Sequence, residues 1–397
     1  MGKQWFGGLV LGWGLLVGLP AHAQYLPMGH GPAPMPEPMP FAPSHTAPSA
    51  VVGPMNPLLA PSGPPDCLGL PPDTPNAFPD CDPVGGEPRG CYIGAGAQAF
   101  QRANPANVPL VRLSSPPFPT ATDPIALDPG NLNPTMAWGP RFTAGLFWGD
   151  HGLDFIGFYV PESSTSLATL ALPVVPTARL AVPLVNPPVG FAPTTFLRAN
   201  VAAISLDNTL ASLECNFRTG VTVCPCISLF IGARYIDQQE RFGLFLDASP
   251  LGLVPPVLTQ QMTYTIRTHN RLVGVQGGLE VMQGVCNWLG IGMHAKGTWG
   301  MNFADVDTTL QRGDGFYGPG AQRRLSTSGQ AYDMSFFVDV YFCNFARVRG
   351  AYSLLWLVGV LDSVDQINFD LLQPLANVDT SGCVFYQGPM VQLEFRF

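Results

Sequence analysis

Charged side chains are scarce in this chain of 397 residues. Asp, Glu, Lys and Arg make up 12% of it, about half the usual share, whereas hydrophobic residues make up 46%. The net charge of −8 argues against nucleic acid as a partner. After residue 23, no apolar run reaches the roughly 20 residues that a transmembrane helix needs. This composition indicates either an all-β protein with a large core or a barrel whose apolar face contacts lipid.

Signatures of catalysis and of metal or cofactor binding are also missing. No Gly-x-Ser-x-Gly motif is present, and Cys224-x-Cys226 lacks both the spacing and the second pair of a zinc site. Residues 94–99 (GAGAQA) partly match a dinucleotide fingerprint, but no helix follows them. We therefore predict no catalytic residue, no cofactor-binding residue, no metal site and no enzyme activity.

The first 90 residues form two segments that we expect to lie outside the folded domain. Residues 1–23 contain Lys3, an apolar run and the triplet Ala21-His22-Ala23, which together are typical of a secretory signal peptide. Residues 24–90 hold nineteen of the 43 prolines, which disfavours a helix or a central strand. We predict an extended, disordered periplasmic segment that acts as a spacer or as a tether to periplasmic partners.

From residue 91 onward, apolar residues alternate with polar or small ones in segments about as long as a membrane-spanning strand. In the last segment, 391–397 (VQLEFRF), every second side chain is apolar and those between are polar. We predict ten strands: 91–102, 140–149, 152–160, 209–218, 227–245, 262–282, 288–302, 331–342, 347–359 and 383–397.

The segments between these strands alternate between long and short, beginning with a long one. Short periplasmic turns and long external loops are typical of outer-membrane barrels, whereas a soluble β-sandwich has no reason to follow this rule. We therefore predict an all-β fold, a transmembrane antiparallel up-and-down β-barrel of about 10 strands over residues 91–397. Both termini would lie in the periplasm, and the outer face would contact outer-membrane lipid.

The polar face of the predicted strands carries charges of both signs. We expect twelve of these side chains to line the lumen: Arg141, Glu214, Arg218, Arg234, Glu280, His294, Lys296, Asp339, Arg347, Arg349, Glu394 and Arg396. We also expect Phe230, Phe337, Tyr341 and Tyr386 to point inward. Barrels of about eight strands are filled by side chains, so ten strands lie near the filled limit. Two interpretations stay open: a charge-paired network that closes a narrow barrel, and a path for small solutes or ions.

The loop at residues 161–208 is rich in proline and apolar residues and carries few charges. Because such a segment is costly to leave in water, we expect it to plug the barrel mouth, to lie on the outer leaflet or to bind a partner at the cell surface. His269 lies near the external end of its strand and could approach Asp237 and Glu240, which gives the alternative of a hydrolase on the barrel wall.

Nine cysteines are an odd number, so at least one has no partner within the chain. Four of them fall at or beside the predicted periplasmic turns: Cys224, Cys226, Cys286 and Cys343. One or two disulfides near that end of the barrel fit this placement, and their connectivity stays open.

Four stretches resemble a planctomycete-type outer-membrane β-barrel family, beta-barrel porin family 7. They are 141–150 (RFTAGLFWGD), 229–240 (LFIGARYIDQQE), 268–278 (THNRLVGVQGG) and 393–397 (LEFRF). The resemblance covers residues 92–397 and implies the barrel architecture, but it brings no assigned activity. We expect an integral outer-membrane protein whose narrow or plugged barrel has a structural or surface-interaction role, with a surface partner bound through the external loops. The alternative is a small-solute porin.

Overall fold

The computed structural model describes residues 89–397 apart from 115–119, 121, 150, 172–178, 192, 222–223, 251–254, 287, 344, 374 and 376. The predicted signal peptide, nearly all of the proline-rich segment, Cys67 and Cys81 lie outside the described residues. None of the helices in the described residues is long and apolar enough to cross a membrane.

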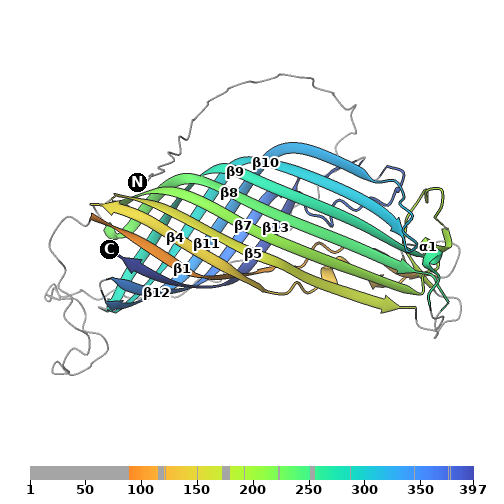
Figure 1. Ribbon diagram of the computed structural model, residues 1–397, viewed down its shortest axis with the longest axis horizontal. Helices are drawn as coiled ribbons and strands as arrows, with labels where there is room; N and C mark the ends of the chain where they lie inside the picture. The colour runs from red at the N-terminus through yellow and green to blue at the C-terminus, as the bar shows by residue number, and fades with distance from the viewer. Residues whose placement is uncertain are drawn as a thin grey trace, which may run out of the picture. The chain divides into compact units, whose positions relative to one another are not determined.

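In the described part of the chain, ten antiparallel strands form a closed barrel (Figure 1). They are β1 (Arg89–Arg102), β4 (Ala137–Trp148), β5 (His151–Leu170), β7 (Val201–Val221), β8 (Cys224–Asp247), β9 (Gln261–Cys286), β10 (Leu289–Arg312), β11 (Ala321–Cys343), β12 (Ala346–Val360) and β13 (Gly382–Arg396). Each strand pairs with the next, and β1 also pairs with β13, where Ile93 opposes Phe395. The last strand therefore closes the cylinder against the first, and the predicted fold class is confirmed.

All ten predicted strands are present; nine of them are longer than predicted, and six of these are longer by five residues or more. β5, β7, β8, β9, β10 and β11 have 20 to 26 residues each, about twice the length that crosses a membrane. β10, for example, was predicted to end at Asn302 and continues to Arg312. In β5, β7, β10 and β11 most of the added residues lie at the end with the long loops, whereas in β8 and β9 most of them lie at the short turn. At the end with the long loops, these six strands rise beyond the other four as a curved wall (Figure 1).

The long strands exchange their two faces about midway. In β10 the outward side chains are apolar up to Phe303, which is 47% exposed, and are then replaced by Asp305 and Asp307. The inward side chains change in the opposite sense, from Lys296 to Val306, and both are buried. The sequence pattern of a lipid-facing strand ends at this point, which is why the predicted strand ended there too.

Exposed aromatic side chains mark both edges of the apolar outer surface. Trp138 and Trp148 in β4, Trp299 in β10 with Trp288 just before it, and Tyr332 and Phe342 in β11 are all exposed. The two members of each pair are roughly ten residues apart, which is the length of one membrane crossing. Aromatic girdles of this kind flank the apolar band of outer-membrane barrels. The half of the barrel nearer the short turns thus carries a belt of membrane height.

Three long loops fill the space inside the wall of long strands, and we call them the loop cap (the described parts of residues 103–136, 171–200 and 361–381). The cap contains a small sheet of β2 (Val111–Ser114), β3 (Ile125–Leu127) and β6 (Arg179–Ala181), the 3-10 turn η2 (Pro129–Asn131) and the helix α1 (Pro193–Leu197). A further 3-10 turn, η3 (Leu258–Gln260), precedes β9. α1 lies at the end of the barrel away from the C-terminus (Figure 1).

Candidate functional site

The structure places all twelve predicted lumen residues on the inner side of the barrel wall. Ten of them line one chamber at the end of the barrel where β1 begins and β13 ends, which we call the terminal end. Arg234 and Asp339 lie behind the chamber lining, where each is paired with charged side chains of that lining. Phe230 and Phe337 also line the chamber, whereas Tyr386 is buried farther from the terminal end.

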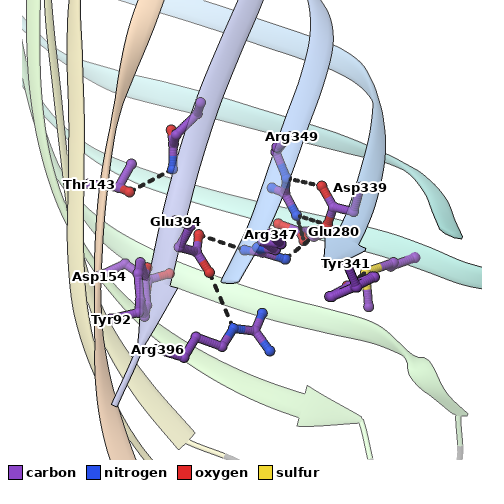
Figure 2. Close-up of polar contacts among 12 residues, drawn as sticks. Tyr92, Thr143, Asp154, Glu280, Asp339, Tyr341, Arg347, Arg349, Glu394 and Arg396 are labelled. Carbon is purple, nitrogen blue, oxygen red and sulfur yellow. Dashed lines mark hydrogen bonds and ion pairs between the residues drawn. The ribbon is translucent and has the colours of Figure 1, made fainter. Parts of the chain in front are cut away.

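A ladder of ion pairs runs around the wall of the chamber (Figure 2). The Asp339 carboxylate forms ion pairs with Arg347 Nη1 at 2.8 Å and with Arg349 Nε at 2.7 Å. Arg347 continues to Glu394 at 2.7 Å, and Arg349 to Glu280 at 3.3 Å. Each charge in the ladder therefore has a partner of opposite sign, and the ion pairs join β9, β11, β12 and β13 along the wall.

The ladder extends to two residues that the sequence analysis did not name. Arg218 joins Glu280 at 3.0 Å to Asp154 at 2.8 Å, and the Tyr92 hydroxyl donates to Asp154 at 2.6 Å. Tyr92 and Asp154 both lie at positions of their strands whose side chains alternate inward, and Gly94 shares the inward face with Tyr92. That parity was the signal available in the sequence.

A second cluster of charges lies deeper in the barrel. Lys296 donates to Glu214 at 2.8 Å, and Arg234 lies 3.2 Å from the same carboxylate. Asp333 faces Arg234 at 3.3 Å, Lys296 at 3.5 Å and His294 at 3.3 Å. Asp333 shares the inward parity of Asp339 but was missing from the predicted set. Arg234 is only 2% exposed, so its charge depends on these carboxylates.

Apolar side chains close the lumen beyond the charged cluster. Phe100, Phe158 and Tyr386 form ring contacts with centroids 5.5 and 6.2 Å apart. They belong to a buried layer completed by Val160, Leu210, Ile236, Leu272, Ala331, Leu355, Leu357, Val360 and Val384. The chamber, with a volume of about 430 Å³, is therefore closed at its inner end.

A buried polar anchor ties the loop cap to the barrel wall. Arg102, at the end of β1, lies 2.6 Å from Glu240 of β8 and 2.7 Å from Asp362 of the cap. Ser363 donates to Glu240 from its N–H and from its hydroxyl, both at 3.2 Å. Burial, followed by the charge of Glu240, raises the pKa of Asp362 to about 7 against the opposing effect of Arg102.

The cap itself packs through apolar side chains against the inner face of the long strands. One buried cluster joins cap residues such as Leu110, Leu180 and Leu361 to wall residues such as Phe242 and Ile266, all 2% exposed or less. Because burying apolar surface contributes roughly 25 cal/mol per Å² of that surface, this cluster stabilises the closed position of the cap. Of the apolar residues in the 161–208 loop, Leu180, Val182, Leu184, Phe191 and Phe196 are thus buried inside the barrel mouth, whereas Val185 and Val189 are exposed.

The predicted approach of His269 to two carboxylates is half right. His269 Nε2 lies 3.0 Å from Asp237 Oδ2, and both side chains are partly exposed. Glu240 points to the interior instead, where it is 3% exposed and bound to Arg102. Asp237 also accepts hydrogen bonds from Tyr235 and Gln239, so the pair belongs to a polar network on the outer wall.

The cysteines whose side chains the structure describes form no disulfides. Cys91, Cys215, Cys286, Cys343 and Cys383 are free thiols. The predicted disulfides at the turns are therefore wrong for Cys286 and Cys343, and the side chains of Cys224 and Cys226 are outside the described set. No group of three or more His, Cys, Asp or Glu side chains in the described set could hold a metal ion.

No family model and no curated protein sequence matches the chain. Among solved structures, the outer membrane protease OmpT from Escherichia coli shares 10% identity at a TM-score of 0.36, covering 78% of this chain and 96% of that one. A deltaS2S3 mutant of the monoaromatic hydrocarbon channel TodX shares 9% identity at a TM-score of 0.26, with 78% and 90% covered. A Pseudomonas aeruginosa FadL homologue shares 10% at a TM-score of 0.25, with the same coverage.

The chain has the fold of an outer-membrane β-barrel protein. The closed antiparallel sheet and the apolar belt between its aromatic edges carry this statement. The similarities to solved structures are too small to transfer the activity or the ligand of any of them.

Proposed function

We propose that the protein is an integral outer-membrane barrel whose external end is closed by its own loops, and that its role is structural or in surface interaction rather than in general diffusion. The terminal end would face the periplasm, because the short turns lie there and the long loops lie at the other end. The loop cap would then face the outside of the cell.

The observation that carries this proposal is the stacking of two closures along one lumen. The loop cap fills the end with the long loops, and the layer around Tyr386 closes the lumen next to the chamber. The anchor around Arg102 joins the two, because Arg102 lies directly opposite Tyr386 in the pairing of β1 with β13 and binds Asp362 of the cap. A diffusion pore needs a continuous aqueous path, and barrels of about this size are readily filled by side chains. Two successive closures that are joined by a buried anchor favour a barrel that does not conduct.

Single-channel recording in planar bilayers tests this proposal. The full-length mature chain should insert without stable conductance steps. A variant lacking Thr169–Gly190 should stay closed as well, because the anchor and the Tyr386 layer remain below the missing loop. A stable, weakly selective pore in the unaltered protein would contradict the proposal and favour a small-solute porin.

The small-solute porin remains the second candidate, and the open chamber favours it. Ions that reach the chamber would pass only if the cap and the apolar layer moved together. Conductance that appears only after the cap anchor is broken, for example in Arg102→Met, would favour this candidate.

Membership of beta-barrel porin family 7 stays a prediction. Its Gly-x-Arg-Tyr-x-Asp pattern coincides here with Gly232, Arg234, Tyr235 and Asp237. Arg234 serves the deep charged cluster and Asp237 the outer polar network, so the pattern is accounted for by folding on both faces of β8. The hypothesis of a hydrolase on the barrel wall is supported only by the His269–Asp237 pair among the described residues.

A further inference from the structure

The chamber at the terminal end has the size and the lining of a small-molecule site. Its volume of about 430 Å³ lies within the usual range for ligand pockets. It is open at the terminal end, near Gly149 and His151 of the β4–β5 turn, and closed at the inner end. A solute could therefore enter and leave on one side without crossing the membrane.

The charges of the chamber do not cancel. The chamber and the pairs directly behind it contain seven Lys and Arg side chains: Arg141, Arg218, Arg234, Lys296, Arg347, Arg349 and Arg396. Six carboxylates face them: Asp154, Glu214, Glu280, Asp333, Asp339 and Glu394. Apart from His294, one positive charge remains in excess.

Arg141 is the side chain that carries this excess. Among the described residues, the six other cations all lie within 3.5 Å of a carboxylate oxygen. Arg141 has only a hydrogen bond from its Nε to Gln392 Oε1 at 3.2 Å. Its two Nη groups lie in the chamber wall and make no hydrogen bond or ion pair with the described residues. Gln392 is itself fixed by a 2.7 Å hydrogen bond to Thr143, so it holds the guanidinium in place.

We propose that the chamber binds one small monoanion, a carboxylate with a short apolar tail, with the carboxylate paired to Arg141. A guanidinium presents two parallel N–H groups that match a carboxylate. One excess charge calls for one negative charge on the ligand, and a dianion would meet Glu214 with its second charge. Ile156, Ala351 and Met390 line the same chamber and provide apolar surface for the tail.

Equilibrium dialysis of the refolded full-length barrel in detergent against radiolabelled butanoate tests this site, at fixed chloride concentration. We expect saturable binding of one butanoate per barrel. Arg141→Gln should weaken it about 10-fold or more, because a charge-assisted pair is lost. The affinity of Arg141→Lys for butanoate should lie between those of the unaltered protein and Arg141→Gln, since the positive charge stays but the two parallel N–H groups of the guanidinium are lost. Inorganic phosphate should compete poorly and methylammonium not at all.

Two further variants separate this site from general electrostatic attraction. Arg323→Gln removes the same charge from an exposed position at the far end of β11 and should bind butanoate as the unaltered protein does. Ala351→Phe leaves every charge in place, fills the chamber and should reduce binding as Arg141→Gln does. Unheated gel mobility checks that each variant is folded.

Three outcomes would overturn the proposal: the absence of saturable binding, equal binding by Arg141→Gln and Arg323→Gln, or full binding by Ala351→Phe. The result is independent of the conductance test. A barrel that never conducts can bind butanoate from the terminal end, and a conducting barrel can fail to bind it.

Discussion

Breaking the anchor of the loop cap should release the cap while the barrel stays intact. Arg102→Met removes the cation that lies between Glu240 and Asp362 and leaves two carboxylates in a buried site. Removing one partner from a buried ion pair costs about 3–5 kcal/mol. Part of this cost will be recovered, because Asp362 can take up a proton instead of staying charged. We therefore expect a loss at the lower end of that range.

Hydrogen exchange of the backbone amides in the 361–381 loop measures this effect. Leu361 and Ser363 donate to Asn270 and Glu240 in the closed cap, so their amides report directly on its opening. A loss of about 3 kcal/mol corresponds to exchange faster by roughly two orders of magnitude. Amides in the middle of β12 should keep their protection. Unchanged exchange at Leu361 and Ser363 in Arg102→Met would refute the anchoring role.

The same anchor predicts a pH dependence of the cap. The pKa of Asp362 is raised from 3.8 to about 7, first by burial and then by Glu240, against the effect of Arg102, with Asp365 adding to the rise. A raised carboxyl pKa contributes stability that is complete below the unfolded-state pKa and is lost as the pH rises through 7. Between pH 8 and pH 5 the cap should therefore become more stable by about 2–3 kcal/mol. Asp362→Asn should remove this dependence, and a cap that loosens toward pH 5 would contradict the sign.

Three further outcomes follow from the barrel wall. Arg234→Leu should lower the free energy of unfolding, measured by urea titration in lipid vesicles, by about 3–5 kcal/mol, because Glu214 and Asp333 lose a buried partner; Arg323→Leu is the matched control and should change little. Phe336→Arg should cost about 2–4 kcal/mol in the same assay, because Phe336 is exposed in the middle of the belt, whereas Thr309→Arg, on the outward face beyond the belt, should be nearly neutral. Leu206→Ala should cost about 2–5 kcal/mol, because Leu206 is fully buried between the wall and the cap, and an effect below about 1 kcal/mol would mean that the cap packs loosely.

The ten strands and the inward side of each could be read from the sequence because a membrane barrel imposes a strict two-residue alternation. One face must be apolar for lipid, so the residues between, such as Arg347 and Arg349, had to point inward. The order of long and short connections then fixed which end carries the loops. These constraints are local and do not depend on which strands become neighbours.

The length of the strands beyond the membrane could not be read in the same way. Beyond Phe303, water replaces lipid outside and the loop cap replaces water inside, so the alternation continues with its faces exchanged. A pattern that changes sign within one strand resembles the end of a strand followed by a loop. The signal available was the continued period of two through Asp305, Asp307 and Thr309.

The anchor of the cap was missed for a different reason. Arg102 and Asp362 are 260 positions apart, and Asp362 belongs to a loop with no regular period. Arg102 had the inward parity of β1, but nothing near it in the chain indicated its partner. Contacts between a strand and a distant loop depend on how the loop folds, which local pattern cannot supply.

The loop cap and the outer wall of the barrel offer different surfaces to a partner at the cell surface. Most of the described apolar residues for which the loops were expected to form a binding surface, such as Leu180, instead belong to the buried cluster that contains Phe242 and Ile266. A partner at the cell surface would therefore meet the polar outer wall around Asp305 and His269, or the exposed loop residues Val189 and Tyr317, which are 97% and 67% exposed. Because most of the apolar surface of the cap packs against the barrel wall, a partner that binds strongly through apolar contacts would first have to open the cap. A lower pH, which stabilises the cap through Asp362, would therefore weaken the binding of such a partner. The binding of a partner to the outer wall would not depend on the state of this anchor.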